Sequence, residues 1–316
     1  MRFIQTIIVL MLGFSQLDCQ SHDPNLAAQL AQSKYKMFYL DFPRDKNGVT
    51  VMTGAADLIA YDFERGKTVP LGYSTYSDRE PVLSPNGHQF AFFADGFPHQ
   101  GAFLLWDFVP RGESMIQTKV ARYLLGDLGI RSMDYFNDST IAFSIENSLY
   151  AVNIRNGATR TLLTIPDQLI DEFKCNRVRP LIALALTPLD SPLGPRTLAF
   201  YEPTLNKLSL TEKSCPFLEN WSPDGKAFLY GCNWANADTV DAIIQHPELT
   251  ERRYSRFTIG SSSASAVFLG RKDTMILLSY IEPSDFYIAL ISSGEIVSRI
   301  TDNTRIKSTV GIFVKD

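Results

Sequence analysis

Short apolar segments alternate with turn-forming residues along the chain after residue 35. The segments are four or five residues long and rich in aromatic and aliphatic side chains, and Gly, Asn, Asp and Pro separate them. This is the pattern of short β-strands, with clear examples at residues 37–40, 58–61, 89–93 and 103–106. No stretch in this part of the chain keeps a helical period for three turns, although residues 167–173 have the apolar spacing of a helical turn. The pattern therefore predicts an all-β protein.

One strand–turn–strand unit occurs twice with a clear common sequence. Residues 81–92 match residues 219–230, and both place Ser-Pro, then Asn or Asp, then Gly between two apolar segments. Proline fixes φ at the first turn position, and glycine takes the positive-φ position that follows Asn or Asp. Weaker copies of this unit are found at residues 133–143, 184–200 and 267–278.

A second unit, in which a glycine-containing turn joins two strands, alternates with the first. It occurs at residues 58–67, 149–158 and 286–295. The inner strands of the resulting repeats are expected to start near residues 81, 131, 180, 217, 264 and 308. The mean interval between these starts is about 45 residues, which is within the range of a four-stranded propeller blade. The repeat therefore favours one β-propeller over two separate domains.

Two of these units also resemble a known propeller family. Residues 221–226 read Trp-Ser-Pro-Asp-Gly-Lys, which resembles the WSPDGK signature of TolB-type propeller repeats, and residues 83–87 are a relaxed copy. The resemblance covers roughly residues 36–316, and it implies a six-bladed β-propeller with an interaction role in the periplasm. Residues 22–35 are too few for the α/β domain that accompanies the propeller in that family, so the resemblance implies no particular partner.

The two ends of the chain are expected to build one blade together. Residues 308–314 supply an inner strand without outer partners, whereas residues 49–71 supply outer strands without an inner one. Joining them would close the ring and remove the exposed sheet edges that invite aggregation. The predicted fold is therefore an all-β, six-bladed β-propeller with ring closure by N- and C-terminal strands.

The N-terminal residues have the pattern of a secretory signal peptide. Arg2 precedes a short apolar run that is followed by small residues, and this run is too short to span a bilayer comfortably. We expect a signal peptide at residues 1–21, a linker or short helix at residues 22–35, and the TolB-like propeller at residues 36–316. The predicted location is periplasmic or secreted, and an uncleaved membrane anchor is the alternative.

The four cysteines allow several interpretations. Cys19 stands where a bacterial lipoprotein carries its lipidated cysteine, but Asp18 is not the small residue that a lipobox needs, so a lipid anchor is the less favoured reading. Cleavage after residue 21 would leave three cysteines and therefore at most one disulfide. The pairing among Cys175, Cys215 and Cys232 stays open, and so does their burial as free, small apolar residues.

The overall composition excludes several classes of protein. The chain has 316 residues, of which 45% are apolar and 20% charged, as in ordinary globular proteins rather than disordered chains. Its 30 Lys and Arg residues against 34 Asp and Glu residues give a net charge of −4. Without a basic patch, the chain is not expected to bind nucleic acid.

The sequence predicts no catalytic, metal-binding or cofactor-binding set of residues. Residues 72–76 and 260–264 nearly match the GxSxG motif of serine hydrolases, but neither lies at a strand-to-helix elbow. Metal-dependent propeller lyases need clustered His and carboxylate ligands. The four histidines, His22, His88, His99 and His246, are not placed to supply such a cluster.

Two groups of residues are candidates for binding. Trp234 lies in a polar segment after a strand, where it could act as an aromatic contact residue. Residues just before inner strands tend to face the mouth of a propeller channel, and arginines there can accept a carboxylate or a sugar acid. The residues in such positions are Arg79, Glu80, Arg131, Arg177 and Arg179. Charges that solvate a wet channel are the alternative interpretation.

Together these observations predict an exported, non-catalytic β-propeller that binds a protein or peptide partner in the cell envelope. The alternative is a hydrolase or lyase that acts on peptide or carbohydrate at the channel mouth. Two carboxylates, or a His–carboxylate pair, converging at that mouth would favour the enzyme.

Overall fold

The computed structural model describes sixteen parts of the chain. They are residues 35–42, 56–62, 67–74, 82–86, 89–94, 102–107, 116–121, 129–214, 217–231, 239–245, 252–258, 264–268, 275–280, 286–290, 296–299 and 306–314. Within these ranges the chain is all-β, as the pattern of apolar residues predicts, and it contains no helix.

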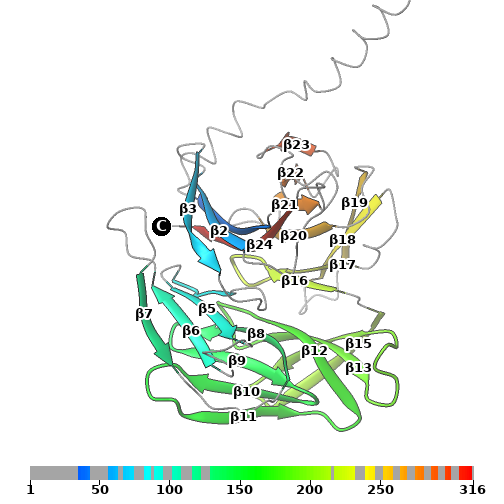
Figure 1. The fold of residues 1–316 in the computed structure, drawn as a ribbon. Helices are drawn as coiled ribbons and strands as arrows, with labels where there is room; N and C mark the ends of the chain where they lie inside the picture. Colours follow the sequence, from blue (N-terminus) through cyan, green and yellow to red (C-terminus); the bar gives the residue numbers. More distant parts are fainter. Residues whose placement is uncertain are drawn as a thin grey trace, which may run out of the picture.

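The described strands form six antiparallel sheets of four strands each (Figure 1). One sheet holds β24 (Ile306–Val314), β1 (Tyr35–Phe42), β2 (Ala56–Asp62) and β3 (Lys67–Ser74), and the next holds β4 (Val82–Leu83), β5 (Gln89–Ala94), β6 (Ala102–Asp107) and β7 (Ile116–Ala121). The third holds β8 (Ile130–Asn137), β9 (Thr140–Ile145), β10 (Ser148–Asn153) and β11 (Thr159–Thr164), and the fourth holds β12 (Gln168–Cys175), β13 (Ile182–Pro188), β14 (Thr197–Glu202) and β15 (Lys207–Ser214). The fifth holds β16 (Phe217–Trp221), β17 (Phe228–Gly231), β18 (Thr239–Gln245) and β19 (Arg252–Thr258), and the sixth holds β20 (Ala264–Phe268), β21 (Met275–Tyr280), β22 (Phe286–Leu290) and β23 (Ile296–Arg299).

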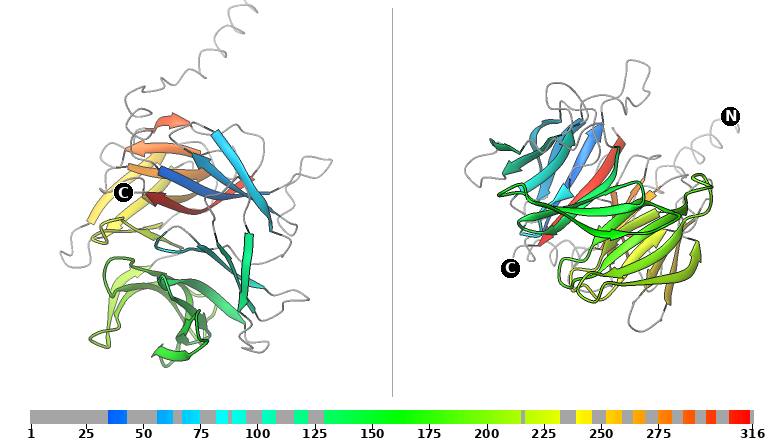
Figure 2. Two further views of the ribbon diagram at one scale, coloured as in Figure 1. Left: turned by 90° about the vertical axis from the view of Figure 1, so that its left-hand side faces the viewer. Right: turned by 90° about the horizontal axis from the view of Figure 1, so that it is seen from below.

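Segments from opposite ends of the chain share one sheet. β24 pairs with β1 in antiparallel register, with Met37 opposite Ile312, and the red C-terminal strand lies next to the blue N-terminal strands in every view (Figures 1 and 2). The N-terminal part contributes three strands to this sheet, β1, β2 and β3. The pattern of the sequence places its contribution at residues 49–71, but β1 starts earlier, at Tyr35.

The expected helical turn at residues 167–173 and the expected inner strand near residue 180 are both wrong. The first strand of the fourth sheet is β12, and β13 follows it as the second strand. The register of β12 against β13 shifts at Asp171, so Ile170 and Phe173 point to the same side and enter the same apolar cluster. A β-bulge inserts an extra residue into the alternation, and here it produces an i, i+3 spacing that resembles a helix.

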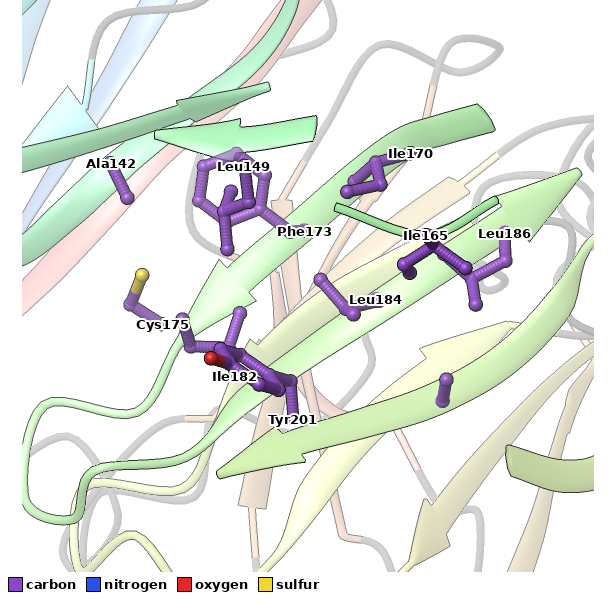
Figure 3. Packing of buried hydrophobic residues seen from close by; sticks show 11 residues of the cluster. Ala142, Leu149, Ile165, Ile170, Phe173, Cys175, Ile182, Leu184, Leu186 and Tyr201 are labelled. Atoms are coloured by element: carbon purple, nitrogen blue, oxygen red, sulfur yellow. The ribbon is translucent and has the colours of Figure 1, made fainter. Parts of the chain in front are cut away.

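The first strands of successive sheets lie against one another. β4 contacts β8, β8 contacts β12, β12 contacts β16, β16 contacts β20, β20 contacts β24, and β24 contacts β4. The apolar core is divided in the same way, because each described cluster joins two neighbouring sheets. In the cluster between the third and fourth sheets, Leu149 of β10 packs with Phe173 of β12 and Leu184 of β13 (Figure 3).

Polar side chains also connect the first strands. Cys175 N–H donates to Asp134 Oδ2 at 2.8 Å, Leu218 N–H donates to a carboxylate oxygen of Glu172 at 3.1 Å, and Phe268 N–H donates to the side chain of Asn220 at 3.3 Å. In each case a side chain of one first strand accepts a backbone N–H of the next. These bonds fix the position of each first strand along the next one, in addition to the packing of apolar side chains between the sheets.

The two clear sequence copies have the same local structure. Ser84 N–H donates to the carbonyl of Gln89 at 2.8 Å, and Gln89 N–H donates to Ser84 Oγ at 2.9 Å. Ser222 and Ala227 make the same two bonds at the same lengths. Gly225 has a φ of 69°, as predicted for the position after Asp in this turn.

Candidate functional site

Four polar side chains meet where β8 and β12 begin. We call the side of the third and fourth sheets at which these two strands begin the start edge. The opposite side, at which they end, is the far edge. Arg131 Nη1 lies 2.7 Å from Asp171 Oδ1, and Arg196 Nε lies 3.4 Å from Asp171 Oδ2. Thr187, near the end of β13, donates its hydroxyl hydrogen to the same Oδ2. Arg131, Asp171, Thr187 and Arg196 form the start-edge cluster.

Two β-bulges place the central pair of this cluster. The register of β8 against β9 shifts at Arg131, and the register of β12 against β13 shifts at Asp171. A bulged residue is left outside the hydrogen-bond ladder, and its side chain is re-aimed. Because β8 and β12 lie against each other, the two bulged residues meet between the sheets.

The cluster combines a buried carboxylate with two partly exposed cations. The Asp171 side chain is 8% exposed, whereas the side chains of Arg131 and Arg196 are 39% and 35% exposed. A buried carboxylate is stable only when it is paired and hydrogen-bonded, and both oxygens of Asp171 have such partners. Counted alone, the cluster has two guanidinium groups and one carboxylate, and so a formal charge of +1.

The loop between β13 and β14, residues 189–196, carries two exposed leucines and ends at Arg196. Leu193 is fully exposed and Leu189 is about half exposed. Leu189 N–H donates to the carbonyl of Asp167 at 2.9 Å, which holds the loop against the beginning of β12. Exposed acidic side chains are present at the same edge, namely Asp167, Asp190 and Glu146.

Asp134 on β8 is a second carboxylate, buried between the same two sheets. Its Oδ1 accepts the N–H of Tyr135 and its Oδ2 accepts the N–H of Cys175, both at 2.8 Å. Burial raises the pKa of the Asp134 carboxyl above its ordinary value, and the charges of Arg177 and Lys174 offset only part of this effect. With both oxygens held by backbone donors, Asp134 connects β8 to β12 instead of facing a ligand.

The far edge holds the other arginines that the sequence suggested. Arg177 and Arg179 lie in the turn between β12 and β13, and Arg177 Nη2 donates to the carbonyl of Leu83 at 2.9 Å. The predicted convergence of these arginines with Arg131 is therefore wrong. It assumed that the first strand of the sheet follows Arg179, but the first strand is β12, which ends at Cys175 and leaves Arg177 and Arg179 at the far edge. Arg79 and Glu80 lie outside the described residues.

Cys175 is a free thiol in the core of the fourth sheet. It packs with Phe173 and Ile182, and burial raises the pKa of its thiol well above the ordinary value, with a further contribution from the Asp134 charge. Cys175 therefore packs as a small apolar residue, one of the two readings that the sequence allowed. Cys215 and Cys232 lie outside the described residues, so a disulfide between them and their burial as free thiols both stay open interpretations.

Sequence reasoning found Arg131 and missed the other three members of the start-edge cluster. Asp171 lies in the segment that was interpreted as a helical turn, and Thr187 and Arg196 flank a loop that carries no motif. Two consecutive acidic residues, Asp171 and Glu172, between Ile170 and Phe173 interrupt the two-residue alternation and could have indicated the bulge. Trp234 and the four histidines lie outside the residues that the structure describes.

Two searches of the described part of the chain, for a metal site and for a membrane-crossing helix, found neither. No three His, Cys, Asp or Glu side chains are grouped there as ligands for a metal ion. No helix long and apolar enough to cross a membrane was found in that part. What the start edge offers chemically is charge recognition, through the partly exposed guanidinium groups of Arg131 and Arg196.

The sequence matches no family model, and it has no significant match among curated proteins.

Proposed function

We propose that the chain is an exported, non-catalytic β-propeller of the TolB type, with six blades, which binds a protein or peptide partner in the cell envelope. The observation that carries the proposal is the order of contacts among the first strands, which runs from β4 through β8, β12, β16 and β20 to β24 and returns to β4. Six four-stranded sheets in this order, with one sheet made from both ends of the chain, are the parts of a closed propeller.

The state of the buried carboxylates supports binding over catalysis. A hydrolase or lyase needs a titratable group that can reach its substrate. Both oxygens of Asp134 accept backbone N–H groups, and both oxygens of Asp171 are held by Arg131, Thr187 and Arg196. The partly exposed groups of the start-edge cluster are the guanidinium groups of Arg131 and Arg196, and arginine is enriched among the residues that dominate binding to polypeptides.

Export rests on the pattern of residues 1–21, a basic residue followed by a short apolar run and small residues. The test is fractionation of the source cells, followed by N-terminal sequencing of the protein. We expect the mature chain in the periplasm or the medium, beginning near residue 22. A cytoplasmic chain that still starts at Met1 would contradict this part of the proposal.

The binding function is tested by capture of partners from envelope extract. The full chain, with an affinity tag after residue 316, is cross-linked in the extract, and the captured proteins are identified by mass spectrometry. The matched control lacks residues 308–316 and therefore most of β24. We expect at least one protein that the full chain enriches and the control does not. No enriched protein, or turnover of peptides or oligosaccharides by the purified chain, would overturn the proposal.

A further inference from the structure

We infer that the peptide bond between Leu193 and Gly194 is a site of limited proteolysis, at which an endopeptidase that prefers a large apolar residue before the cut divides the folded chain in two. The bond lies in the loop between β13 and β14, residues 189–196. Here the protein is a substrate, so the site is independent of the partner that the chain is proposed to bind.

The middle of the loop is exposed to solvent. The side chain of Leu193 is 100% exposed, and residues 189–192 are exposed as well. Exposed loop tips are preferred places for proteolytic nicking. The Leu193 side chain can therefore enter the S1 pocket of an endopeptidase, the pocket that selects the residue before the cut, without leaving a packed position in the protein.

Two prolines leave one bond at the tip of the loop open to cleavage. Residues 191–196 read Ser-Pro-Leu-Gly-Pro-Arg, so Pro192 and Pro195 take part in four of the five peptide bonds of this segment. Proline has a fixed φ and no N–H, and most endopeptidases do not cut on either side of it. The remaining bond joins Leu193 to Gly194.

An endopeptidase binds its substrate in an extended form, so the tip of the loop has to open before it is cut. Gly194 N–H donates to the carbonyl of Ser191 at 2.7 Å, and Ser191 N–H donates to the carbonyl of Pro188 at 3.1 Å. Loss of these two bonds leaves the strands intact, because the pairing of β13 with β14 begins beyond the loop, with Leu186 opposite Thr197. Opening is therefore a local event and does not require unfolding of the sheet.

The two products of the cut are held together by two sheets. Hydrolysis adds one water molecule across the bond and leaves a carboxylate on Leu193 and an ammonium group on Gly194. The first fragment keeps β1–β13, and the second keeps β14–β24. β13 still pairs with β14, and β24 still pairs with β1. We therefore expect a two-chain protein that retains its fold.

The turn between β14 and β15 provides an internal comparison. Leu205 in this turn is also exposed, at 66%, and its bond to Asn206 involves no proline. However, only residues 203–206 join the two strands, and Glu202 pairs with Lys207 at the base of the turn. So short a turn cannot extend into an endopeptidase unless the sheet opens. The longer loop at Leu193 is therefore expected to be cut, and the turn at Leu205 is not.

The test is limited digestion of the folded full chain with subtilisin, a serine endopeptidase whose S1 pocket accepts large apolar residues. The fragments are identified by N-terminal sequencing and mass spectrometry. We expect an early fragment that begins at Gly194 and no early fragment that begins at Asn206. In size-exclusion chromatography under native conditions, the two products of the cut at Leu193 should elute together at the position of the uncut protein.

Two variants and a matched control locate the cut and the state in which it occurs. Leu193→Asp should slow formation of the Gly194 fragment by about tenfold or more, because an apolar pocket discriminates by about that factor against a single missing methylene. Leu205→Asp makes the same change at the other exposed leucine and should leave the rate unchanged. Gly225→Ala, which strains the β16–β17 turn at the far edge, should also leave the rate unchanged, because local opening does not pass through global unfolding.

Three results would overturn the inference. The first is the absence of a fragment that begins at Gly194, and the second is an equal rate of its formation in Leu193→Asp. The third is a faster rate in Gly225→Ala, which would mean that the unfolded chain is the one that is cut. Separation of the two fragments under native conditions would contradict the two-chain form. None of these results depends on the capture of a partner, so they leave the proposed function to its own test.

Discussion

Polar side chains buried between the sheets differ in whether their hydrogen-bonding groups have partners. Asp134 uses both carboxylate oxygens, whereas Ser148 donates its hydroxyl to Asn147 Oδ1 and is also hydrogen-bonded to the Thr164 hydroxyl. Ser144 on β9 is fully buried, and its hydroxyl has no partner within the described residues. These differences matter because an unsatisfied buried group costs more than a typical hydrogen bond contributes.

We expect Ser144→Ala to stabilise the protein. Removing a buried hydroxyl without a partner should raise the free energy of unfolding by about 1 kcal/mol. Ser148→Ala is the matched control, because it removes a bonded hydroxyl and should lower the free energy of unfolding by about 1 kcal/mol. Urea unfolding measures both variants. A loss at Ser144 as large as the loss at Ser148 would indicate that its hydroxyl has a partner.

Asp134 should make stability depend on pH in an unusual direction. Its pKa is raised above the ordinary value of 3.8 by burial, with Arg177 and Lys174 opposing the shift. The folded state therefore binds a proton more tightly than the unfolded state. The contribution of Asp134 to stability is fully present below pH 3.8 and is lost as the pH rises through the raised, folded-state pKa.

Asp134→Asn tests this direction. The variant keeps the shape of the side chain but cannot titrate, and its single oxygen accepts one of the two N–H groups of Tyr135 and Cys175. Urea unfolding of both proteins across acidic and neutral pH gives the difference in stability. We expect this difference to move in favour of the unsubstituted chain as the pH falls. Movement in the other direction would contradict the raised pKa.

At the scale of elements, the sequence predicts hairpins well where side-chain alternation is regular. The units at residues 58–67 and 149–158 correspond to β2–β3 and to the β10–β11 connection. The register shifts of these two pairs skip residues 71 and 162, which lie beyond the matched units, so the alternation inside the units is regular. β12 was missed because its bulge interrupts the two-residue alternation of apolar side chains and leaves a three-residue spacing between Ile170 and Phe173. The start-edge cluster was mostly missed for a related reason: its members come from β8, β12, β13 and the β13–β14 loop, and they meet only through bulges and sheet packing.

The turn between β16 and β17 gives an element-scale prediction at Gly225. A Cβ atom there would lie 2.6 Å from Asn176 Oδ1 and 2.9 Å from Val178 Cβ, and its φ of 69° disfavours other residues. Gly225→Ala should therefore lower the free energy of unfolding by about 1–3 kcal/mol.

Gly129→Ala is the control for this substitution, because no atom lies within 4 Å of its added Cβ. It should change stability by about 0.5 kcal/mol or less. Thermal or urea unfolding compares the two variants. Equal effects at both positions would mean that the close approach of Asn176 to the β16–β17 turn is absent in solution.

At the scale of the whole molecule, cohesion comes from each sheet packing against its two neighbours. The first strands contact one another in order, and apolar clusters fill the described interfaces between sheets. In such an arrangement the loss of one sheet exposes the faces of two others. The sequence predicted that both chain ends contribute to one sheet. Residues 308–314 lack outer strands, and residues 49–71 lack an inner strand, so each segment supplies what the other needs.

Deleting residues 308–316 should destabilise the molecule as a whole. The deletion removes most of β24, which pairs with β1 and contacts β4 and β20. We expect thermal unfolding at a clearly lower temperature, with loss of structure beyond the first sheet. Deleting only residues 315 and 316, which follow β24, is the control and should have little effect. An unchanged unfolding temperature in the longer deletion would contradict closure by β24.

The pairing of β24 with β1 also has a consequence for the timing of folding. The ribosome delivers β1 first among the described strands and β24 last. Until then β1 presents an unpaired backbone edge, which other chains can occupy. A circularly permuted chain that begins with β24 and continues into β1 would make this contact local. Such a chain should refold faster and aggregate less than the natural order of strands.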